Sequence, residues 1–537
     1  MKKLQFFLFI CISIYSYAQP LPRPKLVVGV VIDQMRWDYL YRFYDRFGEG
    51  GFRRLINDGL SCENTFIPYL PAHTAAGHSS IYSGSVPALD GIIGNNWYDR
   101  EQKKLVYCTD DSSVHSVGST SEAGRMSPKN LWSTTIGDEL RMATNFRSKT
   151  ISIAIKDRAS ILPGGHSSNG SFWFDNATGG WITSTYYMQE LPSWIRTIND
   201  KKLPDQYLKQ NWNTLYPLST YVQSTSDTNS FEGKLLGEDA SFPHMTADIT
   251  SNRYETFRTT PGAVSFTFET AKAAIKGENL GGRGITDFLA VSVSSTDYAG
   301  HTFGPNSVEI EDMYLRLDRE LASFLRYLDA SVGKGQYILF LTADHGAAHN
   351  WNFLKSNKLP FGSFDQTKVR RELNAGLEAE FHTKNIIEQY INYQVFINDS
   401  IVRSNGLDGQ KVRQFIMEFL LKQPAVSNVV DLHQVETATL PEAVKTKLVN
   451  GFNQKLSGDI QTILKPSRIE GWQTGTSHGY WNPYDTHIPL LWFGWKVKPG
   501  RLTQEVYMTD IAPTLAAMLH IQMPNACVGK VIEGVAR

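Results

Sequence analysis

Four short apolar segments, spread over the whole chain, constrain the fold more than any other feature of this sequence. They are KLVVGVVID (Lys25–Asp33), FLAVSVSSTD (Phe288–Asp297), YILFLTADHG (Tyr337–Gly346) and IPLLWFGW (Ile488–Trp495). Continuous apolar runs of this kind are typical of strands that are covered on both faces. We therefore expect them to form the strands of one buried sheet.

A helical pattern lies between the second and third of these segments. Over residues 306–333, apolar side chains recur every three to four positions, at Ile310, Met313, Leu317, Leu321, Phe324 and Leu328. This periodicity predicts an amphipathic helix. Strands that alternate with such helices indicate an α/β fold with a mostly parallel central sheet. Ligands of such sheets bind at the carboxyl ends of the strands.

Two stretches differ from this strand and helix pattern. Residues from about 164 to 284 are rich in Trp, Tyr, Ser, Thr, Asn and Gly, with few strand-like runs. We expect an inserted cap there. Residues from about 359 to 459 contain further helical patterns and predict a second insertion. Both would belong to a single domain spanning residues 19–537.

The N-terminus, MKKLQFFLFICISIYSYAQ, has the composition of a secretory signal peptide. Two lysines precede about a dozen mostly apolar residues, and a small residue, Ala18, follows. The apolar run is too short for a stable membrane span. We expect residues 1–18 to be removed on export, which places the mature protein in the periplasm or outside the cell.

Charge and cysteine content exclude several partners. Among 537 residues, Lys plus Arg and Asp plus Glu both number 53. With no net basic charge, neither nucleic acid nor an anionic membrane is an expected partner. Outside the signal segment, Cys62, Cys108 and Cys527 lack zinc-finger spacing. A bound metal would therefore need carboxylate and imidazole ligands.

Acidic and histidine residues gather where the apolar segments end. They are Asp33, Asp297, His301, Asp344 and His345, with His478 in a later loop. An Asp after a strand is usually a turn former or helix cap. Six such groups at one sheet edge, however, would repel or stay unsatisfied without a cation. The set suits two Zn²⁺ ions, with Mn²⁺ or a mixed site as alternatives, and two-metal sites favour phosphoryl or sulfuryl transfer.

Thr74 precedes the small residues Ala75, Ala76 and Gly77. This pattern predicts a helix N-terminus at which a tetrahedral anion can approach the backbone donors. A neighbouring metal would make the Thr74 hydroxyl a nucleophile, and Asn95 would donate an amide hydrogen to the anion. An ordinary helix cap at Thr74 fits the same pattern.

Lys156 and Arg158, in IKDRASILPGGH, could neutralise the same anion. In an extended segment, residues two apart point to the same side. The alternative is a solvated turn in which one of them pairs with Asp157. Spacing alone favours the solvated turn.

Seven segments together resemble the alkaline phosphatase superfamily, specifically the phosphate-irrepressible alkaline phosphatases (PafA type) of Bacteroidetes. They are VVIDQMRWDYL, HTAAGHSSIYSG, GIIGNNWYDR, IKDRASILPGGH, SSTDYAGHTFGPNS, LTADHGAAH and TSHGYWNPYDTHIPLLWFGW, and the resemblance extends from Pro22 to the C-terminus. It implies a three-layer α/β sandwich with cap insertions. It also implies a secreted phosphate-monoester hydrolase of broad range that forms a phosphothreonine intermediate and releases inorganic phosphate.

The resemblance further implies a role for each candidate residue. One zinc would be held by Asp297, His301 and His478, and the other by Asp33, Asp344 and His345. Thr74 would coordinate the second zinc and attack phosphorus, and Asn95, Lys156 and Arg158 would contact the phosphate. We expect a monomer acting on small phosphate monoesters. His73 receives no role.

Two other functions remain open from the sequence. A phosphodiesterase or nucleotide pyrophosphatase on this scaffold would keep the metals but place an apolar pocket where Lys156 and Arg158 lie. A phosphate- or glycan-binding surface protein would have lost catalysis, against which the complete ligand set and Thr74 argue. A sulfatase is excluded because its Cys or Ser nucleophile and the following Pro-x-Arg pattern are absent.

Overall fold

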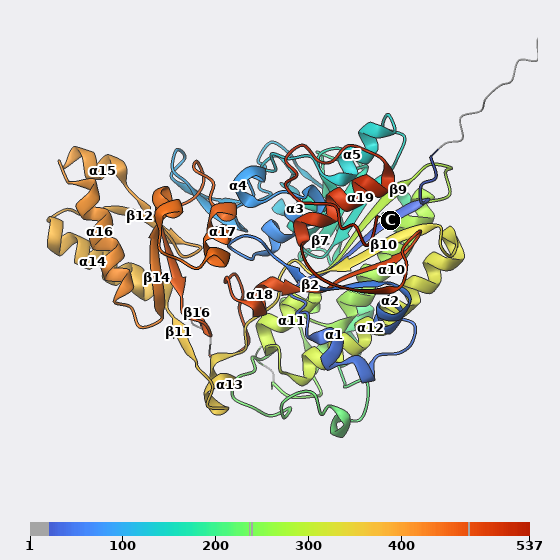
Figure 1. The fold of residues 1–537 in the computed structure, drawn as a ribbon. Helices are drawn as coiled ribbons and strands as arrows, with labels where there is room; N and C mark the ends of the chain where they lie inside the picture. Colours follow the sequence, from blue (N-terminus) through green and yellow to red (C-terminus); the bar gives the residue numbers. More distant parts are fainter. Residues whose placement is uncertain (1–20, 236, 238–239, 471–472, 537) are drawn as a thin grey trace, which may run out of the picture.

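The computed structural model describes residues 21–235, 237, 240–470 and 473–536, so the expected signal peptide at residues 1–18 lies outside them. The described chain is built around an 11-stranded sheet (Figure 1). Its strand order is β17 (His487–Ile488), β2 (Leu60–Phe66), β18 (Leu490–Gly494), β10 (Tyr337–Thr342), β1 (Leu26–Ile32), β9 (Asp287–Val293), β6 (Thr150–Ala154), β7 (Gly170–Asp175), β8 (Gly180–Ser184) and β5 (Ser116–Val117), and β19 (Gly500–Tyr507) pairs with β2.

The centre of this sheet is parallel. β10, β1, β9, β6 and β7 are neighbours that run in one direction, and Val30 of β1 pairs with Leu341 on one side and Val291 on the other. Toward the edges, β18 and β8 run antiparallel to their neighbours. All seven residues of β1 are buried, which explains its continuous apolar sequence. The four expected strand segments became β1, β9, β10 and β18.

Helices cover both faces of the sheet (Figure 1). On one face α10 (Pro261–Glu278) contacts β9 and β6. α12 (Val308–Leu328), α7 (Ser193–Asp200) and α8 (Leu203–Leu208) pack against α10, and α2 (Phe52–Asp58) packs against α12. The other layer consists of α3 (Thr74–Ser83), α5 (Ile136–Ala143), α6 (Asp157–Gly164) and α19 (Ile511–Leu519). The expected three-layer α/β sandwich and the amphipathic helix at α12 are thereby confirmed.

A second, smaller module lies at the left of Figure 1 and has its own hydrophobic cluster, which includes Val395, Ile416 and Ile460. It contains the sheet β12 (Ile387–Ile391), β13 (Gln394–Ile397), β15 (Ile460–Leu464) and β14 (Val426–Asp431), together with α14 (Gln366–Phe381), α15 (Asp399–Ser404) and α16 (Gly409–Leu421). The strand pair β11 (Gly362–Phe364) and β16 (Arg468–Glu470) lies at its base. The module thus begins near the start of the second expected insertion and continues past its expected end.

The cap expected at about residues 164–284 has different boundaries in the structure. β7 and β8 belong to the central sheet, and α10 belongs to its helical layer. These strands escaped the apolar-run criterion because their apolar runs are short, Phe172–Phe174 in β7 and Trp181–Ile182 in β8, and polar or small residues flank them. They are nevertheless buried; Trp181, for example, stacks on Phe266 with ring centroids 4.9 Å apart. Only the connection from residue 209 to 260, which includes the short α9 (Arg253–Phe257), is poor in regular structure where it is described.

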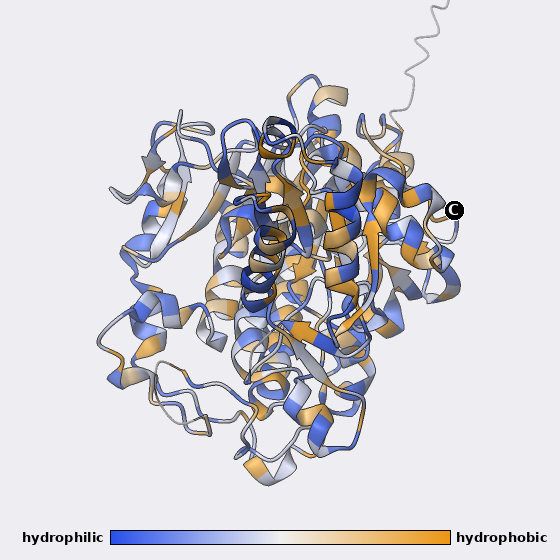
Figure 2. Ribbon diagram, turned by 90° about the vertical axis from the view of Figure 1, so that its left-hand side faces the viewer, coloured by the Kyte–Doolittle hydropathy of each residue, from blue (hydrophilic) through white to orange (hydrophobic). Residues whose placement is uncertain are grey.

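Hydrophobic residues concentrate in the central strands, and the helices carry both hydrophobic and hydrophilic residues, as Figure 2 shows. Within the described residues, no helix combines the length and the hydropathy that a bilayer crossing requires. The cysteines Cys62, Cys108 and Cys527 are free.

Gly29, in the middle of β1, tests how tightly the core is packed. A Cβ added there would lie 2.6 Å from the Phe340 ring and 2.6 Å from the Tyr82 hydroxyl. Because overpacking a close-packed core costs about 1–3 kcal/mol, Gly29→Ala should lower the apparent Tm in thermal unfolding. Gly500→Ala, on β19 of the same sheet, is the control, since its added Cβ would meet only Leu60 Cδ1 at 3.5 Å. Equal Tm values for the two variants would contradict this prediction.

Candidate active site

Four neighbouring parallel strands deliver the candidate residues to one edge of the sheet. Because β10, β1, β9 and β6 are adjacent and parallel, their carboxyl ends lie side by side. The residues that follow these ends are Asp344 and His345 after β10, Asp33 after β1, Asp297 and His301 on α11 (Ser295–Phe303) after β9, and Lys156 and Arg158 after β6. His478 reaches the same place from a loop.

Asp33, Asp344 and His345 form the first group of potential metal ligands. One ligand atom from each lies within 4.8 Å of the others. His345 Nε2 is 3.6 Å from Asp33 Oδ1 and 3.5 Å from Asp344 Oδ2, and all three side chains are fully buried. This is the trio that the resemblance assigns to one zinc.

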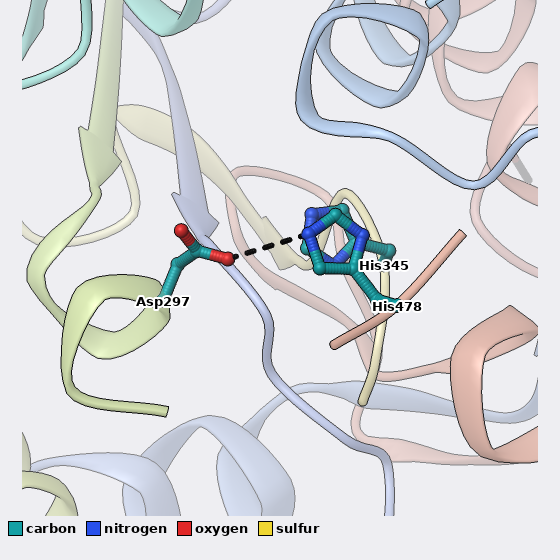
Figure 3. A group of neighbouring side chains, drawn as sticks. All are labelled: Asp297, His345 and His478. Carbon is teal, nitrogen blue, oxygen red and sulfur yellow. Dashed lines mark ion pairs between the residues drawn. The ribbon is translucent and has the colours of Figure 1, made fainter. Parts of the chain in front are cut away.

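The second group is centred on Asp297. Its carboxylate faces the overlapping imidazole rings of His345 and His478, as Figure 3 shows, and the three ligand atoms again lie within 4.8 Å of one another. The two rings stack with centroids 3.5 Å apart. Asp297 Oδ1 is 3.7 Å from His478 Nε2 and 3.2 Å from His301 Nε2. The expected trio Asp297, His301 and His478 therefore meets at one oxygen, while His345 contacts both groups.

Backbone carbonyls orient the three imidazoles. The Nδ1 atoms of His301, His345 and His478 each lie 2.9 Å from a carbonyl oxygen, those of Thr476, Gly346 and Ala72. Nδ1 must donate to a carbonyl, so the Nε2 lone pair of each ring faces the carboxylates. A metal-ligating histidine is normally held in this way.

The carboxylates of this site are short of positive charge. Both Asp33 oxygens and Asp344 Oδ2 are buried without a hydrogen bond of acceptable geometry among the described residues, although Lys156 Nζ lies 2.7 Å from Asp33 Oδ2. Burial, and then the Asp344 charge, raises the pKa of Asp33 well above its usual value. Burial acts in the same sense on Asp297, but His301 and Lys156 hold its pKa well below the usual value. Orphaned buried carboxylate oxygens next to imidazole Nε2 atoms, whose Nδ1 partners are already bound to carbonyls, fit divalent cations such as Zn²⁺.

Thr74 is the first residue of α3, as its sequence pattern predicts. The side chain is almost fully buried, and Oγ1 lies 3.4 Å from His345 Nε2 and 3.4 Å from Lys156 Nζ. The hydroxyl thus borders the first ligand group. Asn95 lies beside it, since Asn95 Oδ1 accepts a hydrogen bond of 2.9 Å from Ala75 N. That bond uses the amide oxygen and leaves the Asn95 NH₂ group as the donor available to a ligand.

Lys156 and Arg158 are not in an extended segment, which was one of the two arrangements considered from the sequence. β6 ends at Ala154 and α6 begins at Asp157, so Lys156 is the N-cap residue and Arg158 lies in the first helical turn. Lys156 is buried, and its Nζ lies 2.5 Å from Asp297 Oδ2, so the solvated-turn alternative is wrong for Lys156. Arg158 Nη1 is 3.9 Å from Asp157 Oδ1, the pairing that this alternative expected, and 3.0 Å from the Tyr107 hydroxyl.

Two further residues contact the ligand groups and were not singled out from the sequence. Gln34 donates from its backbone N to Asp344 Oδ1 (3.1 Å) and from Nε2 to Asp297 Oδ1 (2.7 Å), and so joins the two groups. His78 Nδ1 lies 2.9 Å from the Thr74 carbonyl oxygen and 3.3 Å from Asp344 Oδ2. The four-residue spacing of Thr74 and His78, which puts both on one helix face, was the signal available for His78.

His73, which received no role from the sequence, packs edge-on against His478 with ring centroids 5.7 Å apart. Burial lowers the pKa of His73 to about 3, and electrostatic repulsion from the neighbouring side chains, among them Arg158, acts in the same direction. The ring is therefore neutral at physiological pH. It supports a ligand ring rather than adding charge to the site.

Gly77 lets α3 approach the first ligand group closely. A Cβ at Gly77 would lie 2.6 Å from both the Cβ and the carbonyl oxygen of Asp344. Gly77→Ala should displace Asp344 and reduce both bound metal, measured by elemental analysis, and phosphatase turnover. Gly500→Ala should leave both at the wild-type level. A Gly77→Ala enzyme with unchanged metal content would show that the loop relaxes without disturbing its ligands.

Comparison with known proteins agrees with this geometry. Residues 27–382 match the family model described as Type I phosphodiesterase / nucleotide pyrophosphatase. The chain is 53% identical over 522 residues to alkaline phosphatase PhoV of Synechococcus elongatus, covering 97% of this chain and 94% of PhoV. It is 49% identical over 522 residues to alkaline phosphatase PafA of Elizabethkingia meningoseptica, covering 96% and 95%.

Solved structures of PafA are also similar to this chain. The crystal structure of wild-type PafA has a TM-score of 0.95 with 48% identity, and the match covers 97% of this chain and 100% of that one. A PafA variant with a Thr, an Asn, a Lys and an Arg substituted matches with a TM-score of 0.94, at 48% identity and with 96% and 100% coverage.

The fold and the relatives are those of the alkaline phosphatase superfamily, and the paired acid–histidine groups are consistent with a binuclear metal site of that family. Within it, the chain belongs to the PafA/PhoV-type alkaline phosphatases and is a phosphomonoester hydrolase. The expected link to Bacteroidetes is not shown, because PhoV, at 53% identity, is cyanobacterial.

Proposed function

We propose that this alkaline phosphatase is an exported enzyme of broad substrate range that transfers the phosphoryl group of small monoesters to Thr74 and then to water. The observation that carries the proposal is the place of Thr74 Oγ1. It lies at the start of a helix, 3.4 Å from the potential ligand atom His345 Nε2 and 3.4 Å from the Lys156 ammonium. Among the described residues, no other side-chain hydroxyl has contacts of this kind with both a potential metal ligand and Lys156 Nζ.

Two Zn²⁺ ions are the cofactors we propose. Asp33, Asp344 and His345 would hold one, with Thr74 beside it, and Asp297, His301 and His478 would hold the other. When bound, such ions supply positive charge for the phosphoryl oxygens and make an oxygen nucleophile available at moderate pH. The imidazoles are already oriented for this by their carbonyl partners.

The chain's own residues would bind and orient the phosphate. The start of α3 offers backbone N–H groups and the positive end of the helix dipole. The Asn95 NH₂ group would donate to one oxygen. Lys156 supplies a buried ammonium, whose charge is strong where water is excluded. The planar Arg158 guanidinium can donate to two oxygens at once.

Lys156 and Arg158 support a monoester substrate over a diester. A monoester carries one more anionic oxygen than a diester, and these two cations can neutralise it. The matched family model includes phosphodiesterases and nucleotide pyrophosphatases, which remain the alternative activity. The substituted PafA variant supports the choice, because the same four residue types, in the same chain order, occur here as Thr74, Asn95, Lys156 and Arg158.

Export to the periplasm or the medium rests on the composition of residues 1–18, which has the basic start, apolar run and small residue of a signal peptide. Monomeric behaviour and the absence of nucleic-acid and membrane partners likewise stay expectations from the sequence. Zero net charge supports the latter two.

Removing the charge of Lys156 or of Arg158 should reduce monoester hydrolysis much more than diester hydrolysis. Lys156→Ala and Arg158→Ala should each lower kcat/KM for p-nitrophenyl phosphate by about 10²-fold, and should change that for bis-p-nitrophenyl phosphate much less. Parallel steady-state assays measure both. Lys129→Ala is the control, because Lys129 is a half-exposed lysine that pairs with Asp111 outside the site. Equal losses on the two substrates would contradict the assignment of these cations to the monoester.

Thr74→Ala should abolish turnover while leaving bound metal in place. In the wild type, acid quenching during turnover followed by peptide mass spectrometry should find phosphate on the peptide that contains Thr74. Ser79 and Ser80, further along α3, are the rival hydroxyls, and Ser79→Ala and Ser80→Ala should retain turnover. Phosphate on Ser79 or Ser80, or full turnover by Thr74→Ala, would overturn the proposed nucleophile.

A further inference from the structure

A single β-hairpin links Asn95 to Arg158, two of the residues that we propose to contact the phosphate. It consists of β3 (Asn96–Asp99) and β4 (Lys104–Tyr107), which pair antiparallel with Asn96 opposite Tyr107. Asn95 immediately precedes the hairpin. Cys108, immediately after it, donates from its backbone N to the Asn95 carbonyl oxygen at 3.0 Å. Asn95 and Tyr107 are therefore held at the same end of one small element.

The Tyr107 hydroxyl bridges Asp157 and Arg158 at the start of α6. It donates to Asp157 Oδ1 at 2.6 Å and accepts from Arg158 Nη1 at 3.0 Å. A hydroxyl can do both, because it has one hydrogen and two lone pairs. The direct distance from Arg158 Nη1 to Asp157 Oδ1 is 3.9 Å, too long for a hydrogen bond. The phenol thus supplies the connection that the ion pair lacks.

Arg158 has few other restraints. Among the described residues, its guanidinium hydrogen-bonds one other side chain, that of Tyr107, and its buried Nε has no partner. A long arginine side chain loses considerable rotamer entropy when it is fixed. A partner that holds it before substrate arrives removes that cost from binding and catalysis.

The hairpin is anchored to the smaller module at both of its ends. Arg100, in the hairpin turn, donates to Asp459 Oδ2 at 2.8 Å and lies over the Phe396 ring at 5.0 Å. Asn392, between β12 and β13, donates from Nδ2 to the Asn96 carbonyl oxygen at 2.8 Å. The smaller module thus holds the hairpin at its turn and at the end that faces the site.

We propose that Tyr107 is a positioning residue that holds the Arg158 guanidinium in place for the phosphate, and so sharpens the preference for monoesters over diesters. Through the hairpin it couples the position of Arg158 to that of Asn95. This inference rests on the proposed function, in which Arg158 contacts the phosphate. Tyr107 itself need not touch the substrate.

Tyr107→Phe removes the bridging hydroxyl and keeps the ring. We expect kcat/KM for p-nitrophenyl phosphate to fall about tenfold, the effect of one lost hydrogen bond, with bis-p-nitrophenyl phosphate turnover unchanged. Tyr98→Phe is the matched control on the same hairpin, because Tyr98 packs edge-on against Phe396 and does not contact Arg158. Unchanged monoester kcat/KM in Tyr107→Phe would overturn the inference. So would an equal loss in Tyr98→Phe, which would indicate a general effect on the hairpin.

The same substitution in an Arg158→Ala background separates positioning from direct action. If Tyr107 acts through Arg158, Tyr107→Phe should cause no further loss there, and should weaken competitive inhibition by inorganic phosphate only when Arg158 is present. A tenfold loss in both backgrounds would overturn the inference and assign the hydroxyl a direct or structural role. Unimpaired monoester turnover by Arg158→Ala alone would instead overturn the proposed function of Arg158, and the role of Tyr107 with it.

Discussion

Parallel pairing of β1 with β9 on one side and β10 on the other is the constraint on which the rest of this molecule depends. Because the strands share one direction, Asp33, Asp297 and Asp344 emerge at the same edge of the sheet. Three buried carboxylates so close together would repel one another strongly. The surrounding imidazoles and Lys156 offset that repulsion. The two Zn²⁺ ions of the proposed function would offset it further.

Lys156 shows how closely charge balance and function are connected at this edge. Its ammonium lies between carboxylates of the two ligand groups, 2.7 Å from Asp33 Oδ2 and 2.5 Å from Asp297 Oδ2, and 3.4 Å from Thr74 Oγ1. Burial lowers the pKa of Lys156, but the charges of Asp297 and Asp33 outweigh it and raise the pKa above its usual value. The group therefore stays charged, as the proposed contact with a phosphate oxygen requires.

Much of the fold could be predicted from the sequence because strands buried on both faces need continuous apolar runs, as β1, β9 and β10 show. β7 and β8 were missed because their apolar runs are only two or three residues long. The extended backbone considered for Lys156 and Arg158 was wrong because the turn from β6 into α6 is very short, which periodicity alone does not reveal. Gln34, His78 and Tyr107 carry ordinary local patterns and become significant only through contacts with distant segments.

The sequence by itself determined the α/β class, the chemical nature of the ligand set and the helix start at Thr74. These follow from local periodicity and from residue types that need no partner to be identified. Only the tertiary structure decided that His345 contacts both ligand groups and that the Tyr107 hydroxyl accepts a hydrogen bond from Arg158. Such relations join residues far apart in the chain, and they depend on distances of a few ångströms that packing sets. Sequence spacing alone does not encode them.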